Sequence, residues 1–281
     1  MPETVLDIVW RNLEEGLRGL CEHPIGGDNA SGVVGYALLD LGSGKRAGFR
    51  ENVVFPTAST IKIAILLAVA NKVDSGKLSW DLQIVVPEGR KAGGSGVLSL
   101  FKHEARLSLR DLSALIIAVS DNDATNMCID LVGMDYVNSV LIGLGLQSTR
   151  LRRKMMDFEA AQRGEENVST PGELVRLLEA IYRKDGVNER VSRDVLELLG
   201  LPKDGPFSRA LPAGVKRENK PGGLSHVSVD AGIVHLPKRD FCLAVMGSFL
   251  DGSPEEQVTR VVAAAYRYIA LLSECTDLGR S

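Results

Sequence analysis

The feature that most constrains the fold is an unbroken apolar run from Ile63 to Ala70. A helix that is apolar on every side must be surrounded by other elements, because it has no face to leave in water. The run is also far shorter than the roughly 20 residues that a helix needs to cross a bilayer. The sequence therefore predicts a helix packed on every side within a folded protein, and no membrane partner.

The periodicity of the apolar residues changes twice along the chain. The first 55 residues hold an amphipathic helix and a predicted β-hairpin formed by Val33–Leu41 and Arg46–Phe49. From Ser59 to about Gly200 the pattern is helical, and after Pro202 it returns to strands at Val215–Lys220, Val227–Leu236 and Phe241–Phe249, with a last helix at Glu255–Leu272. We expect an α/β (α+β) fold in which residues 1–55 and 203–281 form a sheet lobe, residues 56–202 form an inserted helical lobe, and the active site lies in the groove between them.

One helix start is strongly marked. Thr170 is the expected N-cap, Pro171 occupies the first helical position, and Glu173 is expected to close a capping box.

Ser59 and Lys62 are separated by one helical turn, directly before the apolar run. Residues three apart share one face of a helix, so the Lys62 amine is expected beside the Ser59 hydroxyl. Burial lowers the pKa of a lysine, and a neutral amine can take the proton of a serine nucleophile. The alternative is an ordinary surface lysine beside a serine at a helix start.

Ser120-Asp121-Asn122 stands at the junction of two helical patterns. All three residue types are favoured N-caps, so the motif can simply start a helix. Capping and catalysis are compatible, since a serine hydroxyl there can pass a proton to a leaving group and an asparagine can bind a substrate amide.

Lys220-Pro221-Gly222-Gly223 follows at the end of a predicted strand. Lys220 can stabilise negative charge, and glycine lets a substrate approach the backbone closely. The alternative is a strand closed by a Pro-Gly turn.

The composition narrows the classes of function. The formal net charge is −3 and no dense basic tract is present, which argues against a nucleic-acid partner. The four cysteines and four histidines show no metal-ligand spacing, so we expect neither a metal nor a cofactor. The Gly93-Gly94-Ser95-Gly96 segment is read as a turn in preference to a phosphate loop. No signal peptide is visible, so we expect a cytoplasmic protein, or a periplasmic or secreted one if a leader has been removed.

In order and spacing, the three motifs resemble those of class A β-lactamases and the penicillin-recognising serine hydrolases. The resemblance covers nearly the whole chain and implies their fold, in which terminal helices flank an antiparallel sheet. It also implies a small-molecule substrate and an acyl-enzyme. The implied roles are Ser59 as nucleophile, Lys62 as general base or relay, Ser120 as second relay, Asn122 as ligand of the substrate amide, Lys220 as electrostatic anchor, Gly222 as a point of close substrate approach, and the N–H groups of Ser59 and Gly223 as the oxyanion hole.

The chain departs from that family at two positions. Pro221 stands where the family has Thr or Ser, whose hydroxyl binds the carboxylate of a β-lactam, and proline offers neither a hydroxyl nor an N–H. Met155 is the expected occupant of the position where class A enzymes carry the glutamate that activates water for deacylation, and a thioether is no base. Asp157 and Glu159 are the candidates to replace it.

These departures leave the functional class open. We expect a serine hydrolase that acts on β-lactams or related amides and esters and releases the acyl group slowly. The alternatives are a penicillin-binding or sensor-like module that does not turn over, and an esterase or acyltransferase with a different substrate. The sequence indicates no oligomeric state.

Overall fold

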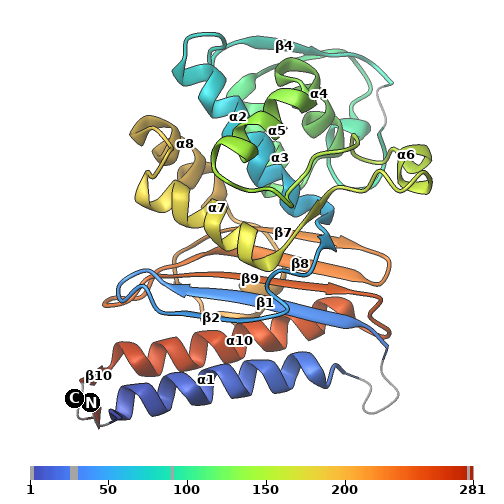
Figure 1. Ribbon diagram of the computed structural model, residues 1–281. Coiled ribbons are helices and arrows are strands. Elements are labelled where there is room, and N and C mark those ends of the chain that lie inside the picture. The colour runs from blue at the N-terminus through green and yellow to red at the C-terminus, as the bar shows by residue number, and fades with distance from the viewer. Residues whose placement is uncertain (1–2, 26–30, 90–91, 277–278, 281) are drawn as a thin grey trace.

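The computed structural model describes residues 3–25, 31–89, 92–276 and 279–280. A five-stranded sheet crosses the molecule between two groups of helices (Figure 1). The helices between residues 62 and 199 lie on one face, and the other face is covered by α1 (Val5–Glu22) and α10 (Pro254–Ser273). The first and last described helices therefore pack side by side under the sheet.

The sheet is antiparallel and has the strand order β2-β1-β9-β8-β7. Its strands are β1 (Val33–Asp40), β2 (Arg46–Phe49), β7 (Arg217–Leu224), β8 (Val227–Val234) and β9 (Phe241–Ser248). β1 pairs with β2 as the predicted hairpin and with β9 from the other end of the chain. The predicted fold class, with one sheet assembled from both ends of the chain, is confirmed.

Both faces of the sheet are buried, which explains why its central strands are apolar without alternation. Successive side chains of a strand point to opposite faces, so Tyr36 and Leu38 join the core beneath α1 and α10, while Ala37 and Leu39 join the core on the helical side. The second of these cores continues without interruption from the sheet into the helices. The division into two lobes at residues 55 and 203 stays a prediction.

The apolar run forms the interior of α2 (Lys62–Asp74), and every residue from Ile63 to Ala70 is at most 2% exposed. The helix packs against α4, α5 and α8, as the prediction of a helix buried on all sides requires. Ser59 lies outside it, because the chain first makes a short 3₁₀ turn, η2 (Ala58–Ile61). The nucleophile candidate and Lys62 therefore stand on two different kinds of turn.

The remaining elements complete the helical side and the edges. They are β3 (Phe55–Pro56) paired with β6 (Val168–Ser169), β4 (Gln83–Val86) paired with β5 (Ala105–Ser108), η3 (Leu98–Leu100), α3 (Leu109–Ala118), α4 (Asn122–Val132), α5 (Met134–Gly143), α6 (Phe158–Gln162), α7 (Pro171–Arg183), α8 (Glu189–Leu199), α9 (Pro206–Ala210), and the terminal pair β10 (Cys275–Thr276) and β11 (Gly279–Arg280).

The start of α7 is only half as predicted. Thr170 caps it and accepts from the backbone N of Glu173 at 3.1 Å. The expected return bond from the Glu173 side chain is wrong, since its carboxylate is buried and accepts from Ser148 N and from Thr149 N and Oγ1 instead. Glu173 thus anchors the segment that leads into the loop between Arg150 and Val168.

The predicted end of the strand at Lys220 is also wrong. β7 continues through Pro221, Gly222 and Gly223 to Leu224, in regular register with β8. Proline is tolerated because β7 is the edge strand, where its missing N–H faces away from the ladder. The Pro-Gly step is therefore part of the sheet edge and makes no turn.

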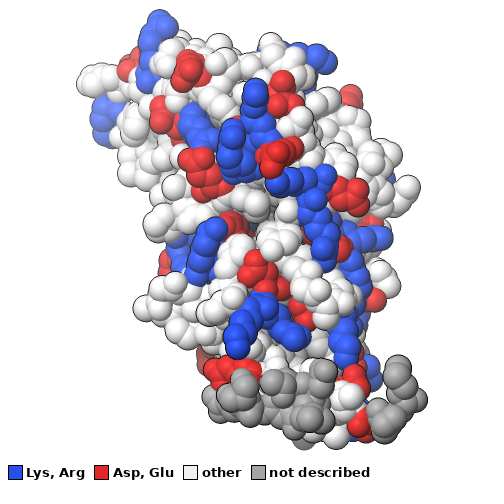
Figure 2. Space-filling model, turned by 90° about the vertical axis from the view of Figure 1, so that its left-hand side faces the viewer, with Lys and Arg blue, Asp and Glu red and all other residues white. Residues whose placement is uncertain are grey.

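Basic and acidic side chains are interspersed on the face shown in Figure 2. Over the molecule as a whole, ion pairs join neighbouring elements, among them Arg110–Glu197 at 2.6 Å and Arg209–Glu255 at 2.8 Å. Among the described helices, none has the length and apolarity required to span a membrane.

Candidate active site

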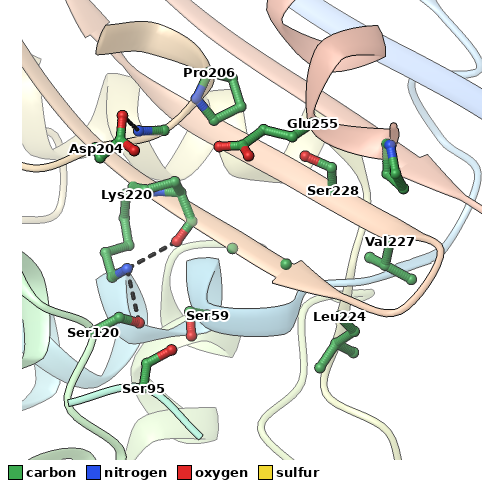
Figure 3. A pocket seen from close by; sticks show the side chains of 15 residues that line it. Ser59, Ser95, Ser120, Asp204, Pro206, Lys220, Leu224, Val227, Ser228 and Glu255 are labelled. Carbon is green, nitrogen blue, oxygen red and sulfur yellow. Dashed lines mark hydrogen bonds between the residues drawn. The ribbon is translucent and has the colours of Figure 1, made fainter. Parts of the chain in front are cut away.

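The three motifs meet at one cleft. Ser59, Ser120, Lys220 and Gly222 all line a pocket of about 310 Å³ between η2, the start of α4 and the edge strand β7 (Figure 3). Ser59 also lines an adjoining pocket of about 220 Å³ on the side of the Arg150–Val168 loop. The half-buried Ser59 thus stands where the two halves of the cleft join.

Gly222 brings the edge strand onto the turn that carries Ser59. A Cβ atom at this position would lie 2.6 Å from the backbone N of Ser59 and 3.0 Å from Thr57 O. No larger residue fits without moving one of the two segments. The close contact places β7 directly beside the nucleophile candidate.

The same edge strand leaves the backbone N–H of Gly223 outside the ladder with β8. Pro221 must direct its nitrogen to the open edge, and residues two apart along a strand direct their N–H groups to the same side. The N–H of Gly223 therefore points to the open edge of the sheet, away from the β7–β8 ladder. The oxyanion hole that the resemblance implies, made by the N–H groups of Ser59 and Gly223, needs such an N–H and stays a prediction.

Lys62 is fully buried, and its amine is turned toward the second motif. Its Nζ atom donates to Ser120 O at 2.8 Å, to Ser120 Oγ at 3.0 Å and to Asn122 Oδ1 at 2.8 Å. Within the described chain, no hydrogen bond joins Lys62 to Ser59. The direct Ser59–Lys62 pair expected from the spacing is thus not formed here, and Ser120 is the group that Lys62 contacts.

Ser120 connects the two lysines. Lys220 Nζ donates to Ser120 Oγ at 3.1 Å and to Pro221 O at 2.8 Å (Figure 3). The backbone of Ser120 has φ of 55°, in the left-handed region that serine rarely adopts. A hydroxyl that touches both amines can accept from one and donate to the other once that one is neutral, which makes it a proton relay.

Burial sets the protonation of both lysines. Desolvation, helped by the charge of Lys220, holds the pKa of Lys62 well below its ordinary value of 10.5. Desolvation likewise lowers the pKa of Lys220 to about 7, although the charge of the buried Asp230 opposes it. A neutral Lys62 is a competent base, and Lys220 is only partly charged near neutral pH.

Asn122 is positioned by both of its side-chain ends. Its Oδ1 accepts from Lys62, and its Nδ2 donates to Gly93 O at 2.9 Å, which leaves the second Nδ2 hydrogen for a substrate carbonyl. Asp121 is the N-cap of α4, and its carboxylate also accepts from Val97 N at 2.6 Å and Leu98 N at 2.9 Å. The glycine-rich segment is therefore held against α4 as one wall of the cleft.

The second pocket has no general base. It is lined by Ala58, Ser59, Gly94, Ser95, Asn122, Arg153, Met155, Met156, Phe158, Asn167, Gly223 and Leu224. Of these described residues, Arg153 is the only one with an ionisable side chain, and it is ion-paired with Glu166 at 2.7 Å. The backbone of Met155 is held by Asn126 through bonds of 2.8 and 3.1 Å. Met155 therefore lines the pocket that adjoins Ser59, and its correspondence to the family's glutamate position stays a prediction.

The two candidate substitute bases are not brought to this pocket. Asp157 is exposed and caps α6 by accepting from Ala160 N at 3.0 Å. Glu159 is also exposed, in the first turn of α6, and neither side chain lines a pocket with Ser59. The described residues also contain no cluster of three or more His, Cys, Asp or Glu side chains that could hold a metal ion.

Three residues of the cleft carried no sequence signal. Asp204, Ser228 and Glu255 line its other end and come from three segments far apart in the chain. No motif or spacing distinguishes them, so only the fold reveals that they share a pocket with Ser59.

Comparison with known proteins agrees with this geometry. A sequence model of the β-lactamase enzyme family matches residues 20–269. The chain belongs to the β-lactamase enzyme family. The predicted membership in a class A β-lactamase-like family of serine hydrolases is thereby confirmed.

Proteins similar to this chain are named for different functions. A protein of Streptomyces cacaoi, the β-lactamase regulatory protein BlaB, is 28% identical over 203 residues, which is 64% of this chain and 65% of that protein. The chain thus covers just under two thirds of that relative. A β-lactamase from Sphaerobacter thermophilus superimposes with a TM-score of 0.82 at 28% identity, covering 94% of this chain and 97% of the other.

A second solved structure is a point mutant of PBP-A in an acyl-enzyme complex with penicillin G. It superimposes with a TM-score of 0.81 at 25% identity, covering 92% of this chain and 97% of the other. Hydrolytic, regulatory and penicillin-binding names therefore all occur among proteins similar to this β-lactamase-family member.

Proposed function

We propose that this protein is an active-site serine enzyme that is acylated on Ser59 by β-lactams and related amides or esters, and that releases the acyl group slowly. Acylation is supported by Ser120, which lines the cleft with Ser59 and accepts from Lys62 at 3.0 Å, and by the close approach of β7 to Ser59, which favours the N–H of Gly223 as a second oxyanion donor. Slow release of the acyl group is supported by the second pocket, which Met155 lines in place of a general base.

The geometry supports a proton path in which each group has one role. Ser59 Oγ attacks the carbonyl carbon while its proton passes to neutral Lys62, which lies one turn away. Ser120 links Lys62 to the leaving atom, and Lys220 holds the Ser120 hydroxyl in place. After the leaving group departs, water must attack from the Met155 side, where none of the described residues that line the pocket is a general base. General-base catalysis is worth about 10²–10⁴-fold, so deacylation should lag acylation by that order.

The apolar lining of the second pocket supports an apolar acyl group. Met155 and Met156 form part of its wall, and the side chains of Phe158 and Leu224 stand at its rim, 60% and 42% exposed. Large exposed apolar residues around a cleft commonly contact ligand. The phenylacetyl group of penicillin G has this character, which makes it a suitable probe.

The test is intact-protein mass spectrometry over time after mixing with penicillin G, with Ser59→Ala as control. We expect an adduct that forms on the native protein, is absent from Ser59→Ala, and persists long after free antibiotic is removed. Equal thermal unfolding of the two proteins shows that the variant is folded. Rapid turnover without a lasting adduct would contradict slow release, and no Ser59-dependent adduct would contradict the whole proposal.

A sensor role is the second candidate, favoured by the same missing base and by the regulatory name of the relative from Streptomyces cacaoi. A sensor needs acylation to change its shape or its contacts. Hydrogen exchange before and after acylation distinguishes the two, because an enzyme with slow release should show protection only around the cleft, while a sensor should show changes on a distant surface.

A further inference from the structure

The end of the cleft beyond Lys220 is acidic. Asp204, just before α9, and Glu255, in the first turn of α10, line the pocket that also contains Ser59. Figure 3 shows them at the end away from Ser59 and Ser120. Arg209 pairs with Asp204 at 2.7 Å and with Glu255 at 2.8 Å, but does not line the pocket. Two carboxylates paired with a single guanidinium leave a negative charge at this end.

Ser228 adds an unused hydroxyl to the same end. It lies opposite Gly223 in β8, is 4% exposed, and lines the pocket with Glu255 (Figure 3). Within the described residues its hydroxyl has no hydrogen-bond partner. Buried polar groups are usually satisfied, so a hydroxyl that faces a pocket without a partner is available to a ligand.

The usual means of binding a carboxylate are weak at this end. Pro221 offers neither hydroxyl nor N–H. Lys220 is the only basic residue among the described residues lining this pocket, and its amine already donates to Ser120 and Pro221. Its lowered pKa of about 7 further reduces its positive charge near neutral pH. A carboxylate entering here would meet Asp204 and Glu255 with little compensation.

We propose that this end of the cleft accepts a leaving group that carries a primary ammonium in place of a carboxylate. Glu255 and Asp204 supply the attraction, and Ser228 accepts one ammonium hydrogen. The inference rests on the proposed acylation of Ser59 and names the leaving group for it. In that step the Ser59 Oγ–carbonyl bond forms, the bond from the carbonyl to the leaving oxygen or nitrogen breaks, and the Ser59 proton passes through Lys62 and Ser120 to the leaving atom.

The test uses three phenylacetate esters whose leaving phenols carry a cationic, a neutral or an anionic meta substituent, and each enzymatic rate is divided by the hydroxide hydrolysis rate of the same ester to correct for phenol acidity. The phenols are meta-(aminomethyl)phenol, meta-(hydroxymethyl)phenol and meta-hydroxybenzoate, and their release is followed by absorbance during the first turnover. We expect the second-order acylation rate to fall in that order, with about tenfold between the ammonium and the carboxylate, or about 1.4 kcal/mol. About 0.5 M NaCl should reduce the ratio, since it screens exposed charges. Equal rates, or a preference for the carboxylate, would overturn the inference.

Variants at Glu255 assign the effect to the pocket. Glu255→Gln should lower the ratio and Glu255→Lys should reverse it, while Glu197→Gln, which removes a carboxylate paired with Arg110 elsewhere, should leave it unchanged. A ratio that survives Glu255→Lys would show that this end of the cleft does not select the leaving group. Thermal unfolding checks that each variant is folded.

Failure of the proposed function gives a different result. If none of the esters yields Ser59-dependent phenol release, acylation itself is wrong. The inference is then decided by binding of the free phenols, followed by NMR titration of the native protein and of Glu255→Lys. Tighter binding of meta-(aminomethyl)phenol to the native protein alone supports the acidic subsite, and equal binding of the charged phenols rejects it.

Discussion

A Cβ atom on Gly222 would lie 2.6 Å from the backbone nitrogen of Ser59. This contact joins the edge of the sheet to the turn that carries Ser59, and it limits how closely β7 can approach η2. The position of Ser59 therefore depends on a residue that is distant from it in the sequence. Acylation should be correspondingly sensitive to the size of residue 222.

Gly222→Ala should slow acylation of Ser59 by about 10²-fold or more, because moving β7 away from η2 separates the oxyanion donors. Overpacking at a close contact should also destabilise the fold by about 1–3 kcal/mol. The acylation rate is measured by mass spectrometry with penicillin G, and stability by urea unfolding.

Gly223→Ala is the matched control on the same strand. A Cβ there meets only Val227 O at 3.6 Å, an ordinary contact, and the backbone N–H is kept. Acylation should stay within a few-fold of the native rate. If the two variants acylate equally fast, the contact between Gly222 and Ser59 does not position the oxyanion hole.

Met155→Glu should shorten the lifetime of the acyl-enzyme. The backbone of Met155 is fixed by Asn126, and its side chain lies in the pocket that adjoins Ser59, so a carboxylate there can reach an attacking water. We expect about 10²-fold faster deacylation, at the lower end of general-base effects, since the surrounding loop has not adapted to the new charge. Met155→Gln, similar in size but without a base, is the control and should leave the adduct long-lived. A similar lifetime in both variants would show that water does not approach from this side.

The fold and the motif residues could be predicted from the sequence because each of them has a local sequence pattern. The buried helix after Lys62 shows as an unbroken apolar run, and Asp121 caps α4 as its residue type suggests. Contacts between distant segments carried no such signature. Three contacts of this kind were not predicted. The Lys62 amine donates to Ser120, and the Glu173 carboxylate accepts from Thr149. The acidic end of the cleft combines Glu255 of α10 with Asp204, which precedes α9. These depend on packing, which no spacing along the chain reveals.

Glu173→Gln should destabilise the protein by about 1–3 kcal/mol, since hydrogen bonds to a charged group contribute that much. The buried carboxylate accepts from Thr149 N at 2.7 Å and from Ser148 N at 2.9 Å, and an amide would turn a donor toward these donors.

Burial opposes ionisation of Glu173, but the bonds from Thr149 and Ser148 outweigh it and lower its pKa below 4.5. Its contribution is therefore present above that pH and lost as the pH falls through the lowered pKa. Urea unfolding at neutral and acid pH measures both effects. Glu197→Gln, at an exposed site, should change stability by less than about 0.5 kcal/mol, and an equal loss in both variants would rule out a special role for Glu173.

The pH dependence of stability should reveal the buried Lys220. Its pKa is about 7 in the folded protein and about 10.5 when unfolded, so the unfolded chain binds more protons between these values. Stability should therefore rise with pH from about 7 to about 10, as the penalty for burying the ammonium disappears.

The buried Asp230 affects stability in a separate, acidic pH range. Burial raises its pKa from 3.8 to about 6, so stability should fall as the pH rises between those values. Unfolding free energies across this range should show a smaller alkaline rise in Lys220→Met, with the remainder coming from Lys62 and Lys203, whose pKa values burial also lowers, and should lose the acid decline in Asp230→Asn. If Lys220→Met keeps the whole alkaline rise, Lys220 remains protonated in the fold, and its role as a partly neutral anchor is wrong.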